Sequence, residues 1–238
     1  MNHILEAKDI QKSFGRCKIL KNINFEIEAG QIVGLLGPNG VGKTTLMKII
    51  CGLLTSDAGT ITIGGYYLEK NPCEYLSQIG MIIEQPALYY NMDAYMNMLL
   101  QARLYGAPDK NRIHKLLSRF ELDNVGKKKI KNFSLGMKQR LGIAMALYSN
   151  PKLLILDEPM NGLDPEGIMV MRDLLRDVAK EGVAVLVSSH ILTEIERLCS
   201  NIIIMNDGYI KNVVTNENTV MTSELEKVYI ETMGEEVH

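Results

Sequence analysis

The chain has 238 residues, a net charge of −2 at pH 7 and 46% apolar residues. This length can form one large domain or two small ones around a substantial core. The near-neutral charge argues against a surface that attracts nucleic acid or an acidic membrane, so we expect no nucleic-acid partner. One local basic run, Lys127-Lys128-Lys129 with Lys131, is interpreted as a solvated loop before a helix.

The cysteines and the apolar runs indicate a cytoplasmic chain. Cys17, Cys51, Cys73 and Cys199 lie far apart and without C-x-x-C spacing, which predicts reduced thiols. Residues 1–6 lack the basic head and apolar stretch of a signal peptide. The longest apolar runs are strand-sized, far below the ~18 residues of a bilayer span. We therefore expect other subunits to hold the chain at any membrane where it works.

Alternating residues near the N-terminus predict an antiparallel sheet. Residues 4–14 and 19–28 are the expected strands, and in the second one Ile23, Phe25 and Ile27 alternate with polar neighbours. Residues 31–36 are apolar on both faces, as in a central strand of a parallel sheet.

A glycine-rich loop follows this apolar strand and leads into a helix that starts near Lys43. The loop matches the pattern GxxxxGK[ST] in the strand-loop-helix setting of a phosphate-binding loop. Glycine allows consecutive N–H groups to point at phosphate oxygens, and the helix N-terminus adds its positive dipole end. The predicted nucleotide-binding residues are Gly37, Pro38, Asn39, Gly40, Val41, Gly42, Lys43, Thr44 and Thr45.

Lys43 and Thr44 supply the chemistry that a bound triphosphate needs. The Lys43 ammonium is expected on the β- and γ-phosphates, and the Thr44 hydroxyl on a Mg²⁺ ion that bridges them. The alternative is a glycine-rich turn that merely starts a helix. The pattern and its setting favour a nucleotide site with Mg²⁺ as cofactor.

The segment from 84 to about 150 has helical spacing and interrupts the strands. The helix after the loop is expected to run to about 52, with strands at 60–63 and 79–83 following it. Asp93 then caps one helix, residues 109–121 form a second, and Ser134 caps a third that runs to Tyr148. The pattern predicts a helical subdomain inserted into an α/β domain.

Two further apolar strands, 153–156 and 183–187, end in polar residues. The first ends at Asp157-Glu158, and His190 follows the second. Because ligands bind at the carboxyl ends of parallel strands, these residues are expected on one rim with the phosphate-binding loop. Asp157 would bind Mg²⁺, and Glu158 would orient or deprotonate the attacking water. The alternatives are helix capping by the carboxylates, and for His190 either capping of the next helix or a phosphate contact.

The rest of the chain completes the α/β pattern. Asp164-Pro165 starts a helix that ends at Gly182, and another helix runs to about 199. Strands are expected at 202–206 and 209–214. We expect one nucleotide-binding domain over residues 1–218 and a C-terminal helix and tail over 219–238.

Six motifs in order resemble those of the ATP-binding-cassette (ABC) ATPases. Besides the phosphate-binding loop, they are Phe14, the run Phe133-Ser134-Leu135-Gly136-Met137 in place of an LSGGQ-type signature, the strand Leu153 to Pro159, the loop Leu163-Asp164-Pro165, and His190. The resemblance spans residues 4 to about 214. It implies a P-loop NTPase (RecA-like) core with a mostly parallel sheet, a flanking antiparallel β subdomain and an inserted α-helical subdomain.

The resemblance also implies roles for residues outside the loop. Phe14 would stack on adenine, while Ser134 and the backbone at Gly136 would reach the γ-phosphate of ATP on a second subunit. Asp164 would line the contact between the subunits. ATP binding would therefore join two copies head to tail, with Lys43, Glu158 and His190 as catalytic residues.

Two positions depart from the family's pattern. Leu135 replaces the first glycine of the signature pair, and Glu84 falls where the family has glutamine, with Gln85 one place later. A carboxylate at 84 can bind Mg²⁺ or water but donates no hydrogen bond when ionised. These departures resemble the branch of bacitracin-resistance and lantibiotic-immunity exporters.

The resemblance implies the ATPase subunit of a transporter, most plainly an exporter of an antimicrobial peptide or similar amphiphile. Multi-span permease subunits would hold the chain on the inner face of the cell membrane. They are expected to dock between Glu84 and the helical insert, on Leu88, Tyr89, Tyr90, Tyr95, Met96 and Met98, although simple core packing would also explain these residues. The alternatives are a cassette ATPase acting on nucleic acid or ribosomes, and an ATP clamp that hydrolyses weakly.

Overall fold

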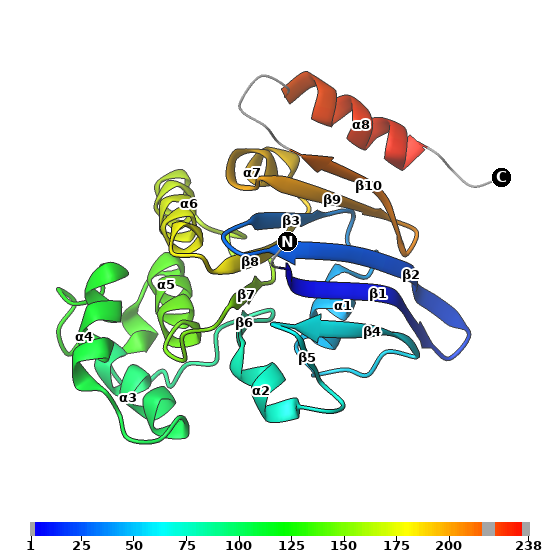
Figure 1. The fold of residues 1–238 in the computed structure, drawn as a ribbon. Coiled ribbons are helices and arrows are strands. Elements are labelled where there is room, and N and C mark those ends of the chain that lie inside the picture. The colour runs from blue at the N-terminus through cyan, green and yellow to red at the C-terminus, as the bar shows by residue number, and fades with distance from the viewer. Residues whose placement is uncertain (1–2, 216–221, 235–238) are drawn as a thin grey trace.

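Two β-sheets organise the chain, and the computed structural model describes residues 3–215 and 222–234 of it. In Figure 1 the strands β3, β8, β7 and β6 of the larger sheet lie between the smaller sheet on the right and the helices α3 to α6 on the left, and β9 and β10 lie above them. The predicted mixed α/β architecture is confirmed, with a mostly parallel sheet and a separate antiparallel one.

The larger sheet has six strands in the order β10-β9-β3-β8-β7-β6. All neighbours pair in parallel except β10, which pairs antiparallel with β9. The central strands are buried on both faces, as expected for parallel strands covered by helices. Their bounds are β3 Ile32–Leu36, β6 Ile79–Ile82, β7 Leu153–Leu156, β8 Ala184–Ser189, β9 Asn201–Asn206 and β10 Tyr209–Thr215.

The smaller sheet is antiparallel, with the order β2-β1-β4-β5. Its strands are β1 His3–Phe14, β2 Cys17–Glu28, β4 Ala58–Ile63 and β5 Tyr66–Tyr67. The predicted alternation in β2 is confirmed, because Ile23, Phe25 and Ile27 are buried while Asn24 and Glu26 are exposed. The pleat turns each apolar residue toward the core and leaves the polar face to solvent.

Two hydrophobic cores lie on opposite faces of the larger sheet. Leu35 of β3 belongs to the core shared with the antiparallel sheet and α1 (Lys43–Ile50), whereas its neighbour Leu36 belongs to the core shared with the other helices. Helices α6 (Pro165–Lys180) and α7 (Leu192–Leu198) contribute to this second core. The strand that precedes the glycine-rich loop is therefore held from both sides.

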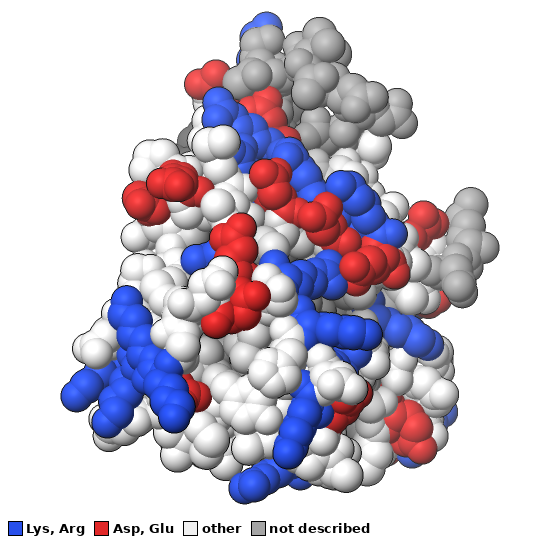
Figure 2. All heavy atoms as spheres, turned by 90° about the vertical axis from the view of Figure 1, so that its left-hand side faces the viewer, with Lys and Arg blue, Asp and Glu red and all other residues white. Residues whose placement is uncertain are grey.

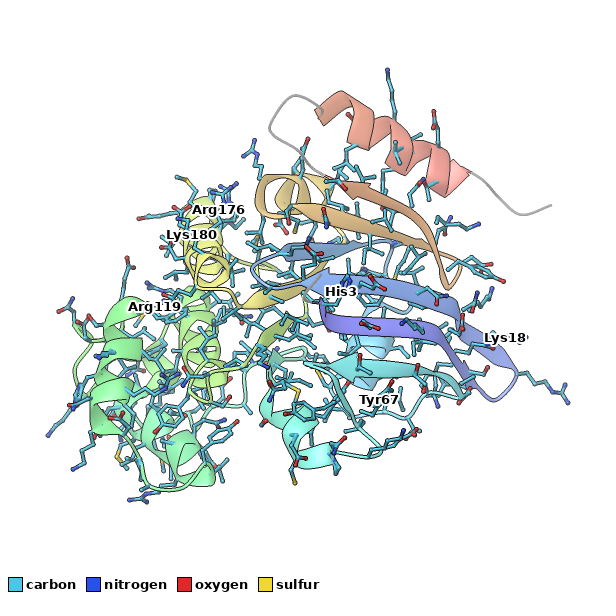
Figure 3. The ribbon with its side chains drawn as sticks, in the orientation of Figure 1. His3, Lys18, Tyr67, Arg119, Arg176 and Lys180 are labelled. Carbon is cyan, nitrogen blue, oxygen red and sulfur yellow. The ribbon has the colours of Figure 1, made fainter. Side chains whose placement is uncertain are left out.

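Between β6 and β7 the chain forms the predicted helices. They are α3 Ala94–Leu104, α4 Lys110–Arg119 and α5 Leu135–Ala146, with a 3-10 turn at Ile130–Asn132. The caps are confirmed, because Asp93 accepts a hydrogen bond from the Met96 N–H and Ser134 accepts one from the Met137 N–H. Arg119 of α4, labelled in Figure 3, forms an ion pair of 2.8 Å with Glu181 at the end of α6 and so links the two helices.

The structure also differs from the prediction in places. A short helix α2 (Pro72–Ser77) and strand β5 were not predicted, because six and two residues are too few for a periodic pattern. Strand β8 continues past the predicted end at 187, since Ser188 and Ser189 still pair with Leu35 and Leu36. A C-terminal helix, α8 Thr222–Gly234, lies within the expected range and packs on β9 and β10. Among the described residues, no helix has the length and apolar character needed to cross a bilayer.

Candidate functional site

The carboxyl ends of three parallel strands meet at one edge of the larger sheet, as predicted. Strand β3 leads into the glycine-rich loop, β7 ends before Asp157, and its neighbour β8 carries Ser188 and Ser189. Hydrogen bonds join the three segments, so the polar residues after separate strands form a single cluster.

The glycine-rich loop wraps around the Lys43 side chain. The Lys43 Nζ donates to the carbonyl oxygens of Gly37 at 2.6 Å and Pro38 at 3.2 Å. Gly42 has φ +111° at the start of α1, a conformation that residues with a side chain rarely adopt. A Cβ atom at Gly37 would lie 2.6 Å from the Met205 carbonyl oxygen, so this position has no room for a side chain either.

Lys43 is a buried cation, with only 5% of its surface exposed. Burial lowers the pKa of its ammonium, although the charges of Glu158 and Asp157 oppose this shift. A desolvated ammonium needs nearby negative charge, and two carbonyl oxygens satisfy it only in part. The arrangement is suited to an anion such as a phosphate group, which would replace the carbonyl contacts.

Thr44 and Asp157 already lie together as a pair of oxygen ligands. The Thr44 hydroxyl donates to Asp157 Oδ2 at 2.8 Å, and the Ser188 hydroxyl donates to Asp157 Oδ1 at 2.5 Å. Hydroxyl and carboxylate oxygens fit Mg²⁺, which protein sites bind through one or two side chains plus substrate phosphates. In the described part of the chain, no group of three or more His, Cys, Asp and Glu side chains could hold a metal by itself.

Glu158 is held in a fixed position beside this pair. Its backbone has φ +48°, which is uncommon for a non-glycine residue, and its N–H donates to the Ser188 hydroxyl at 2.9 Å. The Glu158 Oε1 atom lies 3.1 Å from His190 Nδ1, and the Oε2 atom accepts a hydrogen bond from the Asn161 amide at 3.2 Å. His190, directly after β8, thus contacts the Glu158 carboxylate on one oxygen and Asn161 contacts it on the other.

Phe14 lies at the end of β1 with half of its ring exposed. It pairs with Cys17 across the β1–β2 hairpin, whose tip is marked by Lys18 in Figure 3. The next part of β2 contacts the glycine-rich loop, because a Cβ atom at Gly42 would lie 2.8 Å from the Leu20 side chain. The hairpin therefore presents a half-exposed aromatic ring, with the Lys12 ammonium 5.5 Å from its centroid, while its second strand contacts Gly42 through Leu20.

Three predicted residues form a separate site. Ser134, Gly136 and Asp164 line a pocket of about 390 Å³ between the starts of α5 and α6, and its lining includes none of the Lys43 cluster. Ser134 and Asp164 each cap the helix that they precede. Leu135 is partly exposed, and a Cβ atom at Gly162 would lie 3.0 Å from its side chain.

Glu84 contacts Lys48 of α1. The Lys48 Nζ donates to Glu84 Oε1 at 2.7 Å, and this contact is the largest cause of the lowered pKa of the Glu84 carboxyl group. The Glu84 backbone has φ +65°, so the chain turns sharply after β6. The ion pair links this turn to the helix that begins at Lys43.

The predicted docking region is a cleft, but its residues divide into two groups. Leu88 lines a cavity of about 470 Å³ together with residues of β6, α3 and α5, while Tyr89, Tyr90 and Met96 are exposed. The prediction is wrong for Met98, which is buried in the helical core, and Tyr95 packs against His114 at 5.2 Å. Helical spacing did not reveal which of these side chains face inward.

Three residues of the cluster were not predicted as site residues. Ser188 bridges Asp157 and Glu158, Asn161 contacts the Glu158 carboxylate, and Lys48 contacts Glu84. Ser188 could have been found, because it directly follows an apolar strand that neighbours the phosphate-binding loop. Single asparagine and lysine residues carry no such signal.

Family comparison agrees with this geometry. The model of the ABC transporter family matches residues 20–161, and the chain belongs to this family. Its activity is the ATP hydrolysis that the family couples to transport.

Two relatives are similar over most of the chain. The lantibiotic transport ATP-binding protein SrtF of Streptococcus pyogenes is 44% identical over 207 residues, which cover 87% of this chain and 89% of the relative. The bacitracin transport ATP-binding protein BcrA of Bacillus licheniformis is 44% identical over 209 residues, which cover 87% of this chain and 68% of the relative.

Solved structures share the fold. An ATP-binding subunit of an ABC transporter has a TM-score of 0.83 and 32% identity, with 96% of this chain and 98% of that chain covered. A dimeric ATP-binding cassette bound to ADP and phosphate has a TM-score of 0.78 and 25% identity, with coverages of 90% and 100%.

Proposed function

We propose that this chain hydrolyses ATP to power the export of a peptide antibiotic or similar amphiphile, as self-protection or resistance. The names of two relatives with 44% identity, which state transport of a lantibiotic and of bacitracin, support this cargo class. The observation that carries the proposal is the joined cluster of Lys43, Thr44, Asp157, Glu158 and His190. It contains the groups that phosphoryl transfer from ATP to water requires.

In this proposal the glycine-rich loop binds the phosphates of ATP. Lys43 exchanges its two carbonyl contacts for oxygens of the β- and γ-phosphates, which relieves the desolvation of its ammonium. Phe14 stacks its exposed ring on adenine. Thr44 and Asp157 hold Mg²⁺, which neutralises charge on the phosphates when it is bound. Glu84 would add a ligand or orient a water only after leaving Lys48.

Glu158 is the proposed general base. Its carboxylate would accept a proton from the attacking water, and the bonds to its backbone and side chain hold it ready for that step. His190 contacts the same carboxylate at 3.1 Å and would orient it while reaching the γ-phosphate. The positive φ of Glu158 is a local strain that supports a functional role at this position.

The Ser134 site is proposed to serve a second copy of the chain. Ser134 and Gly136 begin a helix whose N–H groups form a positive end, and Asp164 lies in the same pocket. Because these residues line a pocket apart from Lys43, each ATP would be completed by the partner's helix. A homodimer with two ATP molecules between its subunits follows from this arrangement.

The cleft beside Leu88 is the proposed docking site for a permease subunit. It has about 470 Å³ of space and a mainly apolar lining that includes Leu88, and two exposed tyrosines, Tyr89 and Tyr90, follow Leu88 in the chain. Figure 2 shows this side of the molecule, with a group of Lys and Arg side chains at the lower left and acidic and basic side chains adjoining one another higher up and to the right. In this proposal residues 1–218 form the nucleotide-binding domain, residues 219–238 add a C-terminal helix and tail, and the permease holds the chain on the inner face of the membrane.

The test is antibiotic resistance in the cell that carries the chain. Replacing the wild-type chain by Lys43→Ala should lower the inhibitory concentration of bacitracin or of a lantibiotic, because ATP binding is lost. A Cys73→Ser chain, altered at an exposed residue away from the cluster, serves as the matched control. If the Lys43→Ala cells resist both compound classes as well as wild-type cells do, the proposed cargo is wrong.

A further inference from the structure

The side chain of Asn97 is fully buried among apolar residues of α3, although asparagine is polar. Its amide makes three hydrogen bonds. Oδ1 accepts from the Tyr89 N–H at 2.8 Å, and Nδ2 donates to the carbonyl oxygens of Tyr89 at 3.2 Å and Asp93 at 2.9 Å. A buried amide is costly unless it is bonded in this way. Asn97 therefore fixes both polar backbone groups of Tyr89 against the helix.

The loop that contains Tyr89 is also fixed to the segment before Ser134. The Lys131 N–H donates to the Tyr90 carbonyl oxygen at 3.0 Å, and the Ile130 N–H donates to that of Met92 at 2.9 Å. The Lys138 ammonium, in the first turns of α5, lies 5.2 Å from the centroid of the Tyr90 ring. Residues 88–93, here called the tyrosine loop, thus contact both α3 and the start of α5.

The tyrosine loop begins in the lining of the proposed docking cleft and continues with exposed residues. Leu88 lines the cleft, while Tyr89 and Tyr90 are 59% and 46% exposed. From the Tyr90 carbonyl, one hydrogen bond leads to Lys131, and Ser134 follows three residues later. Lys131 lies in the 3-10 turn Ile130–Asn132, and buried Phe133 joins this turn to Ser134. The path from cleft to Ser134 contains no long flexible segment.

We propose that the tyrosine loop links the docking cleft mechanically to Ser134, and that Asn97 is the positioning residue that makes this link rigid. The inference rests on the proposed function, in which Ser134 contacts ATP held by a second copy. A partner that displaces Tyr89 or Tyr90 also displaces residues 130–131 and with them the start of α5. Because coupling between two sites is reciprocal, closure of Ser134 on ATP must also shift the tyrosine loop.

A fluorescence experiment tests the link in the purified full-length chain. The chain contains no tryptophan, so Tyr90→Trp introduces a single reporter in the tyrosine loop. In a Glu158→Gln background, which retains ATP, addition of Mg²⁺ and ATP should pair two copies and change the tryptophan emission. Asn97→Ser in the same background should abolish the emission change and weaken ATP-driven pairing by about three- to tenfold. ATP affinity of the single copy should stay within about twofold.

Two further variants separate positioning from general stability. Tyr148→Phe removes another buried hydrogen bond of the same helices, from the Asp109 N–H, without touching the tyrosine loop. It should retain the emission change at full amplitude. Lys138→Met removes the surface contact to position 90. It should reduce the emission change without lowering thermal stability. This variant keeps the test decisive if Asn97→Ser does not fold.

The outcomes separate the link from the proposed function. The link is wrong if the Glu158→Gln chain binds ATP and pairs but its tryptophan emission does not change. The link is also wrong if the emission change keeps its full size in both Asn97→Ser and Lys138→Met. An equal loss in Tyr148→Phe would also overturn it, since Asn97 would then act only through stability. If the Glu158→Gln chain fails to bind ATP or to pair, the proposed function itself is wrong.

Discussion

Ser188 offers a sharp test of how the proposed catalytic cluster is held. Its buried hydroxyl donates to Asp157 Oδ1 at 2.5 Å and accepts from the Glu158 N–H at 2.9 Å. Ser188→Ala removes both bonds and leaves a carboxylate oxygen and a backbone N–H without this partner. One charged and one neutral bond together correspond to about 3 kcal/mol. For a chain of this size, that loss lowers the melting temperature by about 6–12 °C.

The same substitution should reduce turnover, because Ser188 fixes the backbone from which the Glu158 carboxylate projects. A misplaced catalytic group can cost up to about 10²-fold in rate. Thermal unfolding by circular dichroism without nucleotide and steady-state release of phosphate with Mg²⁺ measure the two effects.

Ser189→Ala is the matched control for this prediction. Ser189 is the buried neighbour, but its hydroxyl donates to Glu194 and accepts from the Ile191 N–H, away from the two carboxylates. Its turnover should exceed that of Ser188→Ala by at least about tenfold. Equal turnover of the two variants, measured below their melting temperatures, would refute the positioning role of Ser188.

Three further substitutions or treatments test other parts of the site. Glu158→Gln should lower turnover by about 10²- to 10⁴-fold while ATP still binds, as measured by phosphate release and equilibrium dialysis, and a wild-type rate would mean that the base is assigned wrongly. Glu84→Gln removes the charge that pairs with Lys48 and should change the Mg²⁺ dependence of turnover; an unchanged Mg²⁺ titration would show that the carboxylate has no special role. The Cys51 thiol, whose pKa burial raises to about 12, should resist a disulfide reagent at pH 8 until the chain unfolds, and rapid labelling of the native chain at this residue, located by mass spectrometry, would contradict the burial.

Local patterns were sufficient where the signal lies within a few consecutive residues. The apolar runs before Gly37 and Asp157 predicted buried parallel strands, and polar residues directly after them predicted a shared edge. Helix caps at Asp93 and Asp164 were equally visible, because a capping side chain bonds the backbone only three residues later.

Contacts between distant segments could not be predicted in the same way. Nothing near Glu84 in sequence indicates that its carboxylate meets Lys48, which is 36 residues away. The burial of Met98 depends on how α3 packs against its neighbours, while Met96, two positions earlier, stays partly exposed. The continuation of β8 through Ser188 depends on pairing with β3, which extends regular structure into residues that alone favour a loop.

Mixing two inactive variants measures most directly whether ATP is completed by two copies. Lys43→Ala removes the lysine proposed to bind phosphate, and Ser134→Ala removes the hydroxyl of the separate site, so each variant alone should hydrolyse little ATP. A mixed dimer has one site in which intact Lys43 of one copy faces intact Ser134 of the other. An equimolar mixture should therefore regain up to about a quarter of wild-type turnover, because half of the dimers are mixed and each has one complete site. A mixture that stays as inactive as its components would contradict the account, since Ser134 would then serve the ATP of its own chain.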